Sequence, residues 1–208
     1  MNLPDPHPGW SPPRPLQMPT VYLPASNNDD LAERLMDRRI IRLAGPLDLL
    51  AVNDASARLM LLDATGDDPI ELVVSCPEGE LTAAMALADT IELVGVQVQA
   101  TAVGVVGGVA LVPYAVCTRR LAQEHATFRL VNPRQSVMGF ARGLADAVEH
   151  ELRFVGEFHK RLGRATARSF EEIEADFDRG RFLTAAQAIG YGLVDEIVRK
   201  GGSLGPAR

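Results

Sequence analysis

The sequence predicts an α/β fold in which layers of helix pack on a largely parallel sheet. Short apolar segments alternate with helical ones along the chain, and most of the apolar segments are apolar on both faces, as buried parallel strands are. With 208 residues, 47% of them hydrophobic, the chain is long enough to form one core without disulfide or metal support. No internal repeat is visible.

The first segment, residues 1–24, holds eight of the fourteen prolines. Each proline removes a backbone donor and restricts the residue before it, so this segment is predicted to be an extended or disordered arm. It is either a free tail, which its composition favours for residues 1–16, or an arm that docks on a neighbour. We expect the folded domain over 25–200 and a flexible tail over 201–208.

The amino-terminal half of the domain alternates regularly. Ala51, Ala55, Leu59 and Leu62 recur at the spacing of one helix face, and the Gly45-Pro46 pair ends the first strand. We expect helices over 30–36, 50–62, 81–93 and 109–116, and strands over 39–44, 70–74, 96–106, 120–122 and 126–131.

The carboxyl half is more helical. Its longest helix carries one apolar stripe over about six turns, made of Phe140, Leu144, Val148, Leu152, Val155, Phe158 and Leu162. Core packing and an interface with another subunit both explain this stripe. A capping box begins a short helix at Ser169, and Thr184 begins another.

Composition excludes several classes of function. A net charge of −6 argues against nucleic acid or an anionic membrane as the main partner. No apolar run reaches the ~20 residues of a membrane helix, and no secretory signal is present, so we expect a cytoplasmic protein. Cys76 and Cys117 stand at no zinc-ligand spacing, and neither metal nor cofactor is predicted.

Two strand–turn–helix junctions, 75–80 and 103–110, are the candidate sites, because ligands of α/β sheets bind where strands end. Their motifs, S-x-P-x-G and then V-G-x-x-G-G, resemble the proteolytic subunit of the Clp protease, a serine peptidase. Further matches carry the resemblance from about Leu31 to Arg199, in the segments 39–48, 76–83, 176–188 and 189–195. The resemblance implies a crotonase-like layered fold with repeated β-β-α units and a protruding long helix.

The same resemblance assigns a serine nucleophile, a histidine base and an orienting aspartate to Gly108, Val131 and Gly180. Acyl transfer by such a triad needs a hydroxyl, an imidazole and a carboxylate, and none of the three residues supplies one. A shift of the alignment by two residues around Gly108 reaches no hydroxyl, although Asp178 lies two residues before Gly180. His150 and His159 are predicted to be surface residues of the long helix.

The substitution of side chains leaves the backbone N–H groups of the loops in place. The resemblance assigns the two N–H groups of an oxyanion hole to Gly79 and Val109. Glu78 and Glu80 flank Gly79 and are interpreted as solvated residues at the start of a helix, stabilised by its dipole. Cys76 is interpreted as a small buried residue.

The leading hypothesis is a non-catalytic Clp-protease-like subunit. It would form a homo- or hetero-oligomeric ring with subunits of this kind, and an ATP-dependent unfoldase is a further partner that the resemblance implies. A second hypothesis is a crotonase-type enzyme that holds an acyl thioester on the N–H groups of Gly79 and Val109, with Glu78 and Glu80 as acid/base groups. A third, weaker one is residual peptidase activity through Cys76.

Overall fold

The computed structural model describes residues 27–133 and 144–198, and a five-stranded sheet forms its centre. In spatial order the strands are β1 (Ile40–Ala44), β2 (Ile70–Ser75), β3 (Val98–Ala102), β5 (Arg119–Gln123) and β8 (Glu196–Val198). All neighbouring strands of this sheet run parallel. The predicted α/β class with a largely parallel sheet is therefore confirmed.

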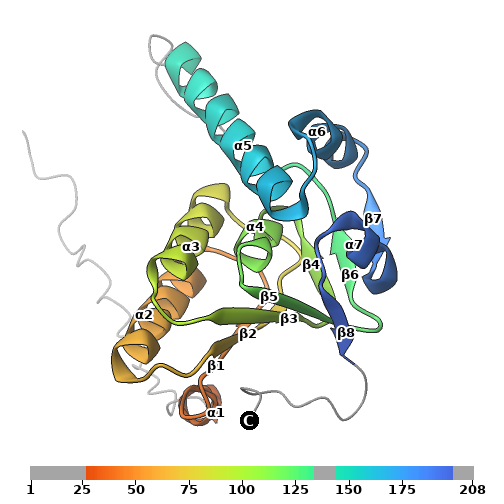
Figure 1. Ribbon diagram of the computed structural model, residues 1–208. Helices are drawn as coiled ribbons and strands as arrows, with labels where there is room; N and C mark the ends of the chain where they lie inside the picture. The colour runs from red at the N-terminus through yellow and green to blue at the C-terminus, as the bar shows by residue number, and fades with distance from the viewer. Residues whose placement is uncertain (1–26, 134–143, 199–208) are drawn as a thin grey trace, which may run out of the picture.

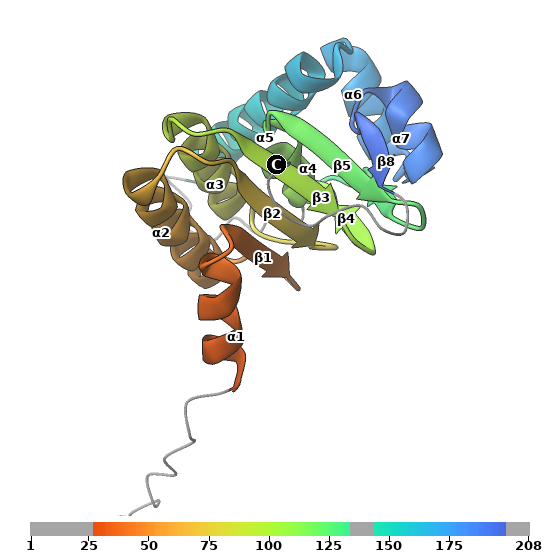
Figure 2. The same ribbon diagram turned by 60° about the horizontal axis from the view of Figure 1, so that its bottom comes forward.

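Helices α2 (Leu49–Thr65), α3 (Leu81–Leu93) and α4 (Leu111–Ala115) lie on one side of this sheet (Figure 1). Helix α1 (Asn27–Met36) leads into β1 and lies beside it at the edge of the sheet (Figure 2). The buried apolar side chains of these strands and helices form one continuous core. Helix α3 has the predicted bounds, and it begins directly after the loop of the first candidate junction.

The predicted strand over 96–106 is wrong, because the chain changes sheets within it. β3 ends at Ala102, and β4 (Val105–Gly107) belongs to a second sheet with β6 (Thr127–Arg129) and β7 (Phe182–Thr184). Gly104 makes the turn between them with φ +73, a conformation that glycine adopts without strain. Since Val103 and Val105 are both apolar, hydropathy gives no sign of this turn.

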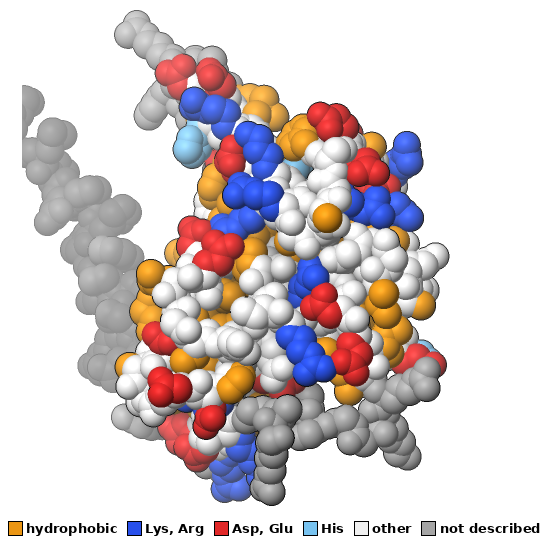
Figure 3. Space-filling view, viewed as in Figure 1, with side chains coloured by type: hydrophobic (Ala, Val, Ile, Leu, Met, Phe, Trp, Pro, Cys, Tyr) orange, Lys and Arg blue, Asp and Glu red, His pale blue; other side chains and the backbone are white. Residues whose placement is uncertain are grey.

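The carboxyl half contains α5 (Leu144–Thr166), α6 (Phe170–Asp178) and α7 (Ala185–Tyr191). The base of α5 packs on α4 and α6, and its other end projects away from the rest of the molecule (Figure 1), as the space-filling view from the same side also shows (Figure 3). Both predicted helix starts are confirmed, since Ser169 and Thr184 each form a complete capping box. The predicted long protruding helix is also confirmed, because α5 has 23 residues and projects at one end.

The short strands β7 and β8 were not predicted. Each has three residues and is defined by pairing with a strand that is distant in sequence, β7 with β6 and β8 with β5. The arm over 1–24, the tail over 201–208 and Phe140 lie outside the described residues. Among the helices within the described ranges, none is long and apolar enough to cross a membrane.

Candidate functional site

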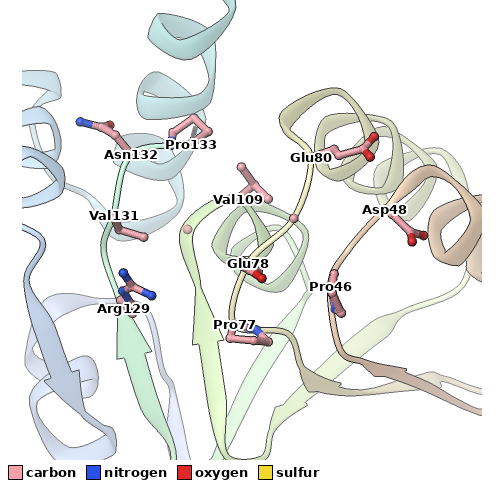
Figure 4. Close-up of a pocket in the computed structure, with 12 residues that line it drawn as sticks. Pro46, Asp48, Pro77, Glu78, Glu80, Val109, Arg129, Val131, Asn132 and Pro133 are labelled. Atoms are coloured by element: carbon pink, nitrogen blue, oxygen red, sulfur yellow. The ribbon is translucent and has the colours of Figure 1, made fainter. Parts of the chain in front are cut away.

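A cavity of about 280 Å³ opens where four loops meet. Each loop follows the carboxyl end of a strand, namely β1, β2, β4 or β6. The residues that line the cavity (Figure 4) are Pro46, Asp48, Pro77, Glu78, Gly79, Glu80, Gly108, Val109, Arg129, Val131, Asn132 and Pro133. Both junctions singled out in the sequence contribute to it, at the end of the strands where ligands of α/β sheets bind.

The loop after β2 is held in place by backbone contacts to Leu47. The N–H of Leu47 donates to the carbonyl of Glu78, and the N–H of Glu80 donates to the carbonyl of Leu47, both at 2.9 Å. Because successive N–H groups of an extended chain alternate in direction, the N–H of Gly79 lies on the side away from Leu47. A Cβ at Gly79 would lie 2.6 Å from the Leu47 oxygen, so this close approach requires glycine.

The loop after β4 approaches the loop after β2 just as closely. The N–H of Gly107 donates to the carbonyl of Cys76 at 2.8 Å, and a Cβ at Gly107 would lie 2.5 Å from the oxygen of Pro77. Val109 follows in the short 3-10 turn η1 (Gly108–Ala110) that leads into α4. The first N–H groups of a helix have no intrahelical acceptor. Gly79 and Val109, the residues expected to supply oxyanion N–H groups, thus both line the cavity.

Gly108, Val131 and Gly180 lie close together. A Cβ at Gly108 would stand 3.4 Å from the Val131 oxygen and 3.5 Å from its Cγ1, which is ordinary contact. Leu130, beside Val131, donates its N–H at 2.8 Å to the carbonyl of Arg181, the residue after Gly180. Gly108 and Gly180 have φ of +53 and +63, and a Cβ at Gly180 would meet nothing within 4 Å. A Cβ therefore fits at both glycines without a clash, although their positive φ strains any L side chain.

The chemistry of the lining is limited. In the part of the chain that the structure describes, the cavity wall contains no serine, threonine, tyrosine, cysteine, histidine or lysine. Its charged groups are Asp48, Glu78 and Glu80 on one side and Arg129 across the cavity (Figure 4). Asp48 accepts from the N–H of Ala51 at 2.8 Å and so caps α2. The described part of the wall therefore offers carboxylates, one guanidinium and backbone donors, and no hydroxyl, thiol or amine nucleophile.

Cys76 lies just outside this wall and is 1% exposed. Burial raises the pKa of its thiol to about 11, against the effect of a hydrogen bond from the backbone of Ser75, so the reactive thiolate is scarce at neutral pH. The interpretation of Cys76 as a small buried residue agrees with this position. The geometry argues against Cys76 as a nucleophile.

The prediction that His159 is a surface residue is wrong, whereas His150 is exposed as expected. His159 is 3% exposed, and its Nε2 lies 3.1 Å from Oδ1 of Asn132, a residue of the cavity wall. The side-chain amide of Asn132 in turn donates to Oδ1 of Asp178 at 2.7 Å. A histidine, an amide and a carboxylate thus form a chain of hydrogen bonds behind the wall.

The burial of His159 could have been predicted from its position along the long helix. His159 comes four residues after Val155 and three before Leu162, so it shares the apolar face of the helix. Burial lowers the pKa of His159, although the charge of Asp178 opposes the shift. Nothing in the sequence around Asn132 indicates that it would join the two groups.

Within residues 27–133 and 144–198, no three His, Cys, Asp or Glu side chains stand together as a metal site would require. Comparison with protein families gives one finding. A family model described as Clp protease matches residues 24–201, which is most of the chain.

Proposed function

The chain belongs to the Clp protease family, and from this premise we propose that it is a catalytically inactive subunit of an ATP-dependent Clp-type complex. Members of this family form oligomeric rings. The proposed role is structural or regulatory: the subunit changes the chamber, its entrances or the docking of an ATP-driven unfoldase. The proposed setting is the cytoplasm.

The observation that carries the proposal is the lack of reactive side chains at Gly108, Val131 and Gly180. If these residues stand at the nucleophile, base and acid positions, the cavity has no hydroxyl to attack a peptide and no imidazole to take its proton. Cys76, the nearest thiol, is buried. The N–H groups of Gly79 and Val109 can stabilise an oxyanion only after a nucleophile has formed one.

Helix α5 supports the assembly part of the proposal. Its base is buried through Phe158 and Leu162, whereas Val148 and Leu152 further out are 40% and 67% exposed. Exposed apolar side chains in line on one helix favour an interface with another chain. The proposed partner is a second copy of this subunit or an active paralogue.

Assembly is tested by native mass spectrometry of the purified chain, alone and mixed with an active paralogue. The proposal expects rings that contain this chain in at least one of the two samples. A chain that stays monomeric and never co-elutes with the paralogue contradicts it. Mixed rings would also be assayed with a fluorogenic peptide, where the turnover expected per ring is proportional to the number of active subunits.

A second candidate function is a crotonase-type reaction on an acyl thioester. What favours it is that Glu78 lies on the cavity wall next to Gly79 and Val109, the pair that would hold a thioester enolate. Calorimetry with an acyl-CoA distinguishes the two functions. Micromolar binding in the cavity supports the thioester reaction, and the absence of binding leaves the inactive subunit.

A further inference from the structure

The hydrogen-bonded chain of His159, Asn132 and Asp178 joins three separate elements. His159 is on α5, Asn132 follows β6, and Asp178 is the last residue of α6. Neither a peptidase triad nor an oxyanion hole uses this chain, and it stands whether or not the subunit cuts peptides. We call it the His159–Asn132–Asp178 bridge.

The hydrogen bonds of the bridge fix which imidazole nitrogen of His159 carries a proton. An ionised carboxylate only accepts hydrogen bonds, so the Asn132 amide nitrogen must point at Asp178 and its oxygen at His159. The His159 Nε2 must then donate to that oxygen. The neutral imidazole with its proton on Nε2 therefore satisfies the bridge at neutral pH.

The surroundings of His159 disfavour a second proton on the ring. Three phenyl rings pack on the imidazole, Phe158 at 5.3 Å, Phe170 at 5.9 Å and Phe177 at 5.0 Å between centroids. The exposed fraction of His159 is 3%. An imidazolium in this place loses most of its hydration and gains only the distant carboxylate of Asp178.

Several of the other charged groups on the packed elements have partners of their own. On α6, Asp176 binds Arg181 at 3.0 Å. On α5, Lys160 binds Glu157 at 2.8 Å. On the strand before Asn132, the Arg129 guanidinium stacks over the ring of Phe182 at 5.7 Å. Asp178 is thus the charge that acts on His159, and it offsets only part of the burial.

We propose that the His159–Asn132–Asp178 bridge is a pH-sensitive clamp, which holds the base of α5 and the end of α6 on the cavity wall at neutral pH and loosens when His159 is protonated. The sign follows from the burial of the imidazole among three phenyl rings, which favours its neutral form in the closed conformation, in the same direction as the lowered pKa of His159. An opened conformation, with an ordinary histidine pKa of 6.5, takes up the proton more readily than the closed one. The clamp is at full strength above about pH 6.5 and weakens as the pH falls below that value.

The test is hydrogen exchange on the intact protein between pH 7.5 and 5.0, with each rate corrected for the intrinsic effect of pH. In the wild type we expect amides of α6 and of the base of α5 to lose protection below pH 6.5, by up to about tenfold per pH unit for one coupled proton. His159→Gln keeps an amide donor near Nε2 and cannot titrate, so its protection should stay constant. His150→Gln, at an exposed histidine of the same helix, should behave as the wild type.

Two further measurements keep the test decisive if His159→Gln does not fold. Asp178→Asn removes the charge that favours the imidazolium, so the loss of protection in acid should become larger than in the wild type. The imidazole of His159, followed by NMR, should titrate below pH 6.5, the ordinary value of a histidine. Equal loss of protection in the wild type and His159→Gln, or a midpoint for His159 at or above pH 6.5, overturns the clamp.

Discussion

The candidate cavity lies at the carboxyl ends of strands from both sheets, whereas the junction of β5, α7 and β8 lies at the amino ends of two strands of the central sheet. The two regions use side chains in opposite ways. At the junction, Arg120 donates to both carboxylate oxygens of Asp195, and to the carbonyls of Ala165 at 2.9 Å and Gly192 at 2.8 Å. One guanidinium therefore ties four segments together. At the cavity, two glycines bring the loops together, and the positions Gly108, Val131 and Gly180 bear no reactive group.

At the junction, the charge of Arg120 also changes the pKa of its partner Asp195. Partial burial raises the pKa of Asp195, but the hydrogen bonds and charge of Arg120 outweigh it and lower the pKa below its ordinary value. Charged side chains at the junction thus stabilise the fold. The cavity loops are instead held by backbone hydrogen bonds and by glycines at close approaches. The predictions below test this contrast, beginning with the largest effect.

The first prediction restores the missing groups. The triple variant Gly108→Ser, Val131→His and Gly180→Asp should hydrolyse a fluorogenic peptide at least about 100-fold faster than the wild type, the scale of a positioned general base acting on a nucleophile. A side chain fits at Gly108 and Gly180, although the positive φ at each adds strain of about 1–2 kcal/mol. The matched control replaces Gly108 by Ala in place of Ser.

A triple variant that folds and assembles as the wild type does, and yet shows no more turnover than the alanine control, would break the comparison. The cavity would then not have the backbone geometry of a serine peptidase.

The second prediction concerns the junction. Arg120→Met should lower the free energy of unfolding by about 2–3 kcal/mol, because it removes the side-chain hydrogen bonds to Asp195 and to two carbonyls. Arg119→Met is the matched control on the same strand, since its pair with Glu196 is exposed on both sides and contributes about 0.5 kcal/mol or less. Urea denaturation of both variants measures the difference. Equal losses would show that Arg120 has no special part in the fold.

The third prediction tests whether the cavity loops depend on glycine. Gly79→Ala should destabilise the protein by about 1–3 kcal/mol, because the added Cβ would overlap the backbone of Leu47. Gly190→Ala, in α7 with nothing within 4 Å of the added Cβ, should be neutral or stabilising by about 0.5–1 kcal/mol. Thermal unfolding of the two variants is the measurement. If Gly79→Ala is as stable as Gly190→Ala, the loop is not tightly held.

The smallest effect on stability is expected on α5. Leu152→Ser should change the free energy of unfolding by no more than about 0.5 kcal/mol, because its side chain is 67% exposed. It should nevertheless weaken assembly, and the neighbouring Arg153→Ser should not. Sedimentation velocity of the two variants gives the comparison. Equal assembly in both would remove Leu152 from the interface.

The fold was largely predictable where local signals and the sheet agree. Pro77 and Gly79 mark the turn before α3, so the bounds of that helix were predicted correctly. The strand over 96–106 failed because the turn at Gly104 depends on φ, which hydropathy does not report. The three-residue strands β7 and β8 are set by pairing with distant segments, and no local pattern marks them.

In the candidate site, too, features with a local sequence pattern were predictable, and contacts between distant segments were not. The loops that carry Gly79 and Gly108 were found from their turn motifs, since glycines at close approaches leave a pattern in the sequence. His159 was assigned to the surface because a charged or polar type on a long helix is usually solvated. Its burial depends on three phenylalanines, and Phe170 and Phe177 come from the next helix. Its link to Asn132 and Asp178 is a tertiary contact that spacing alone does not reveal.

The most direct test of the inactive-subunit proposal is peptide turnover measured across the size-exclusion peak of the purified chain, with an active paralogue added in a second run. We predict an assembly of several subunits in which turnover is absent for this chain alone and follows the paralogue when that is present. Turnover that coincides with the peak of this chain alone would contradict the account, whether or not alkylation of its thiols abolishes it.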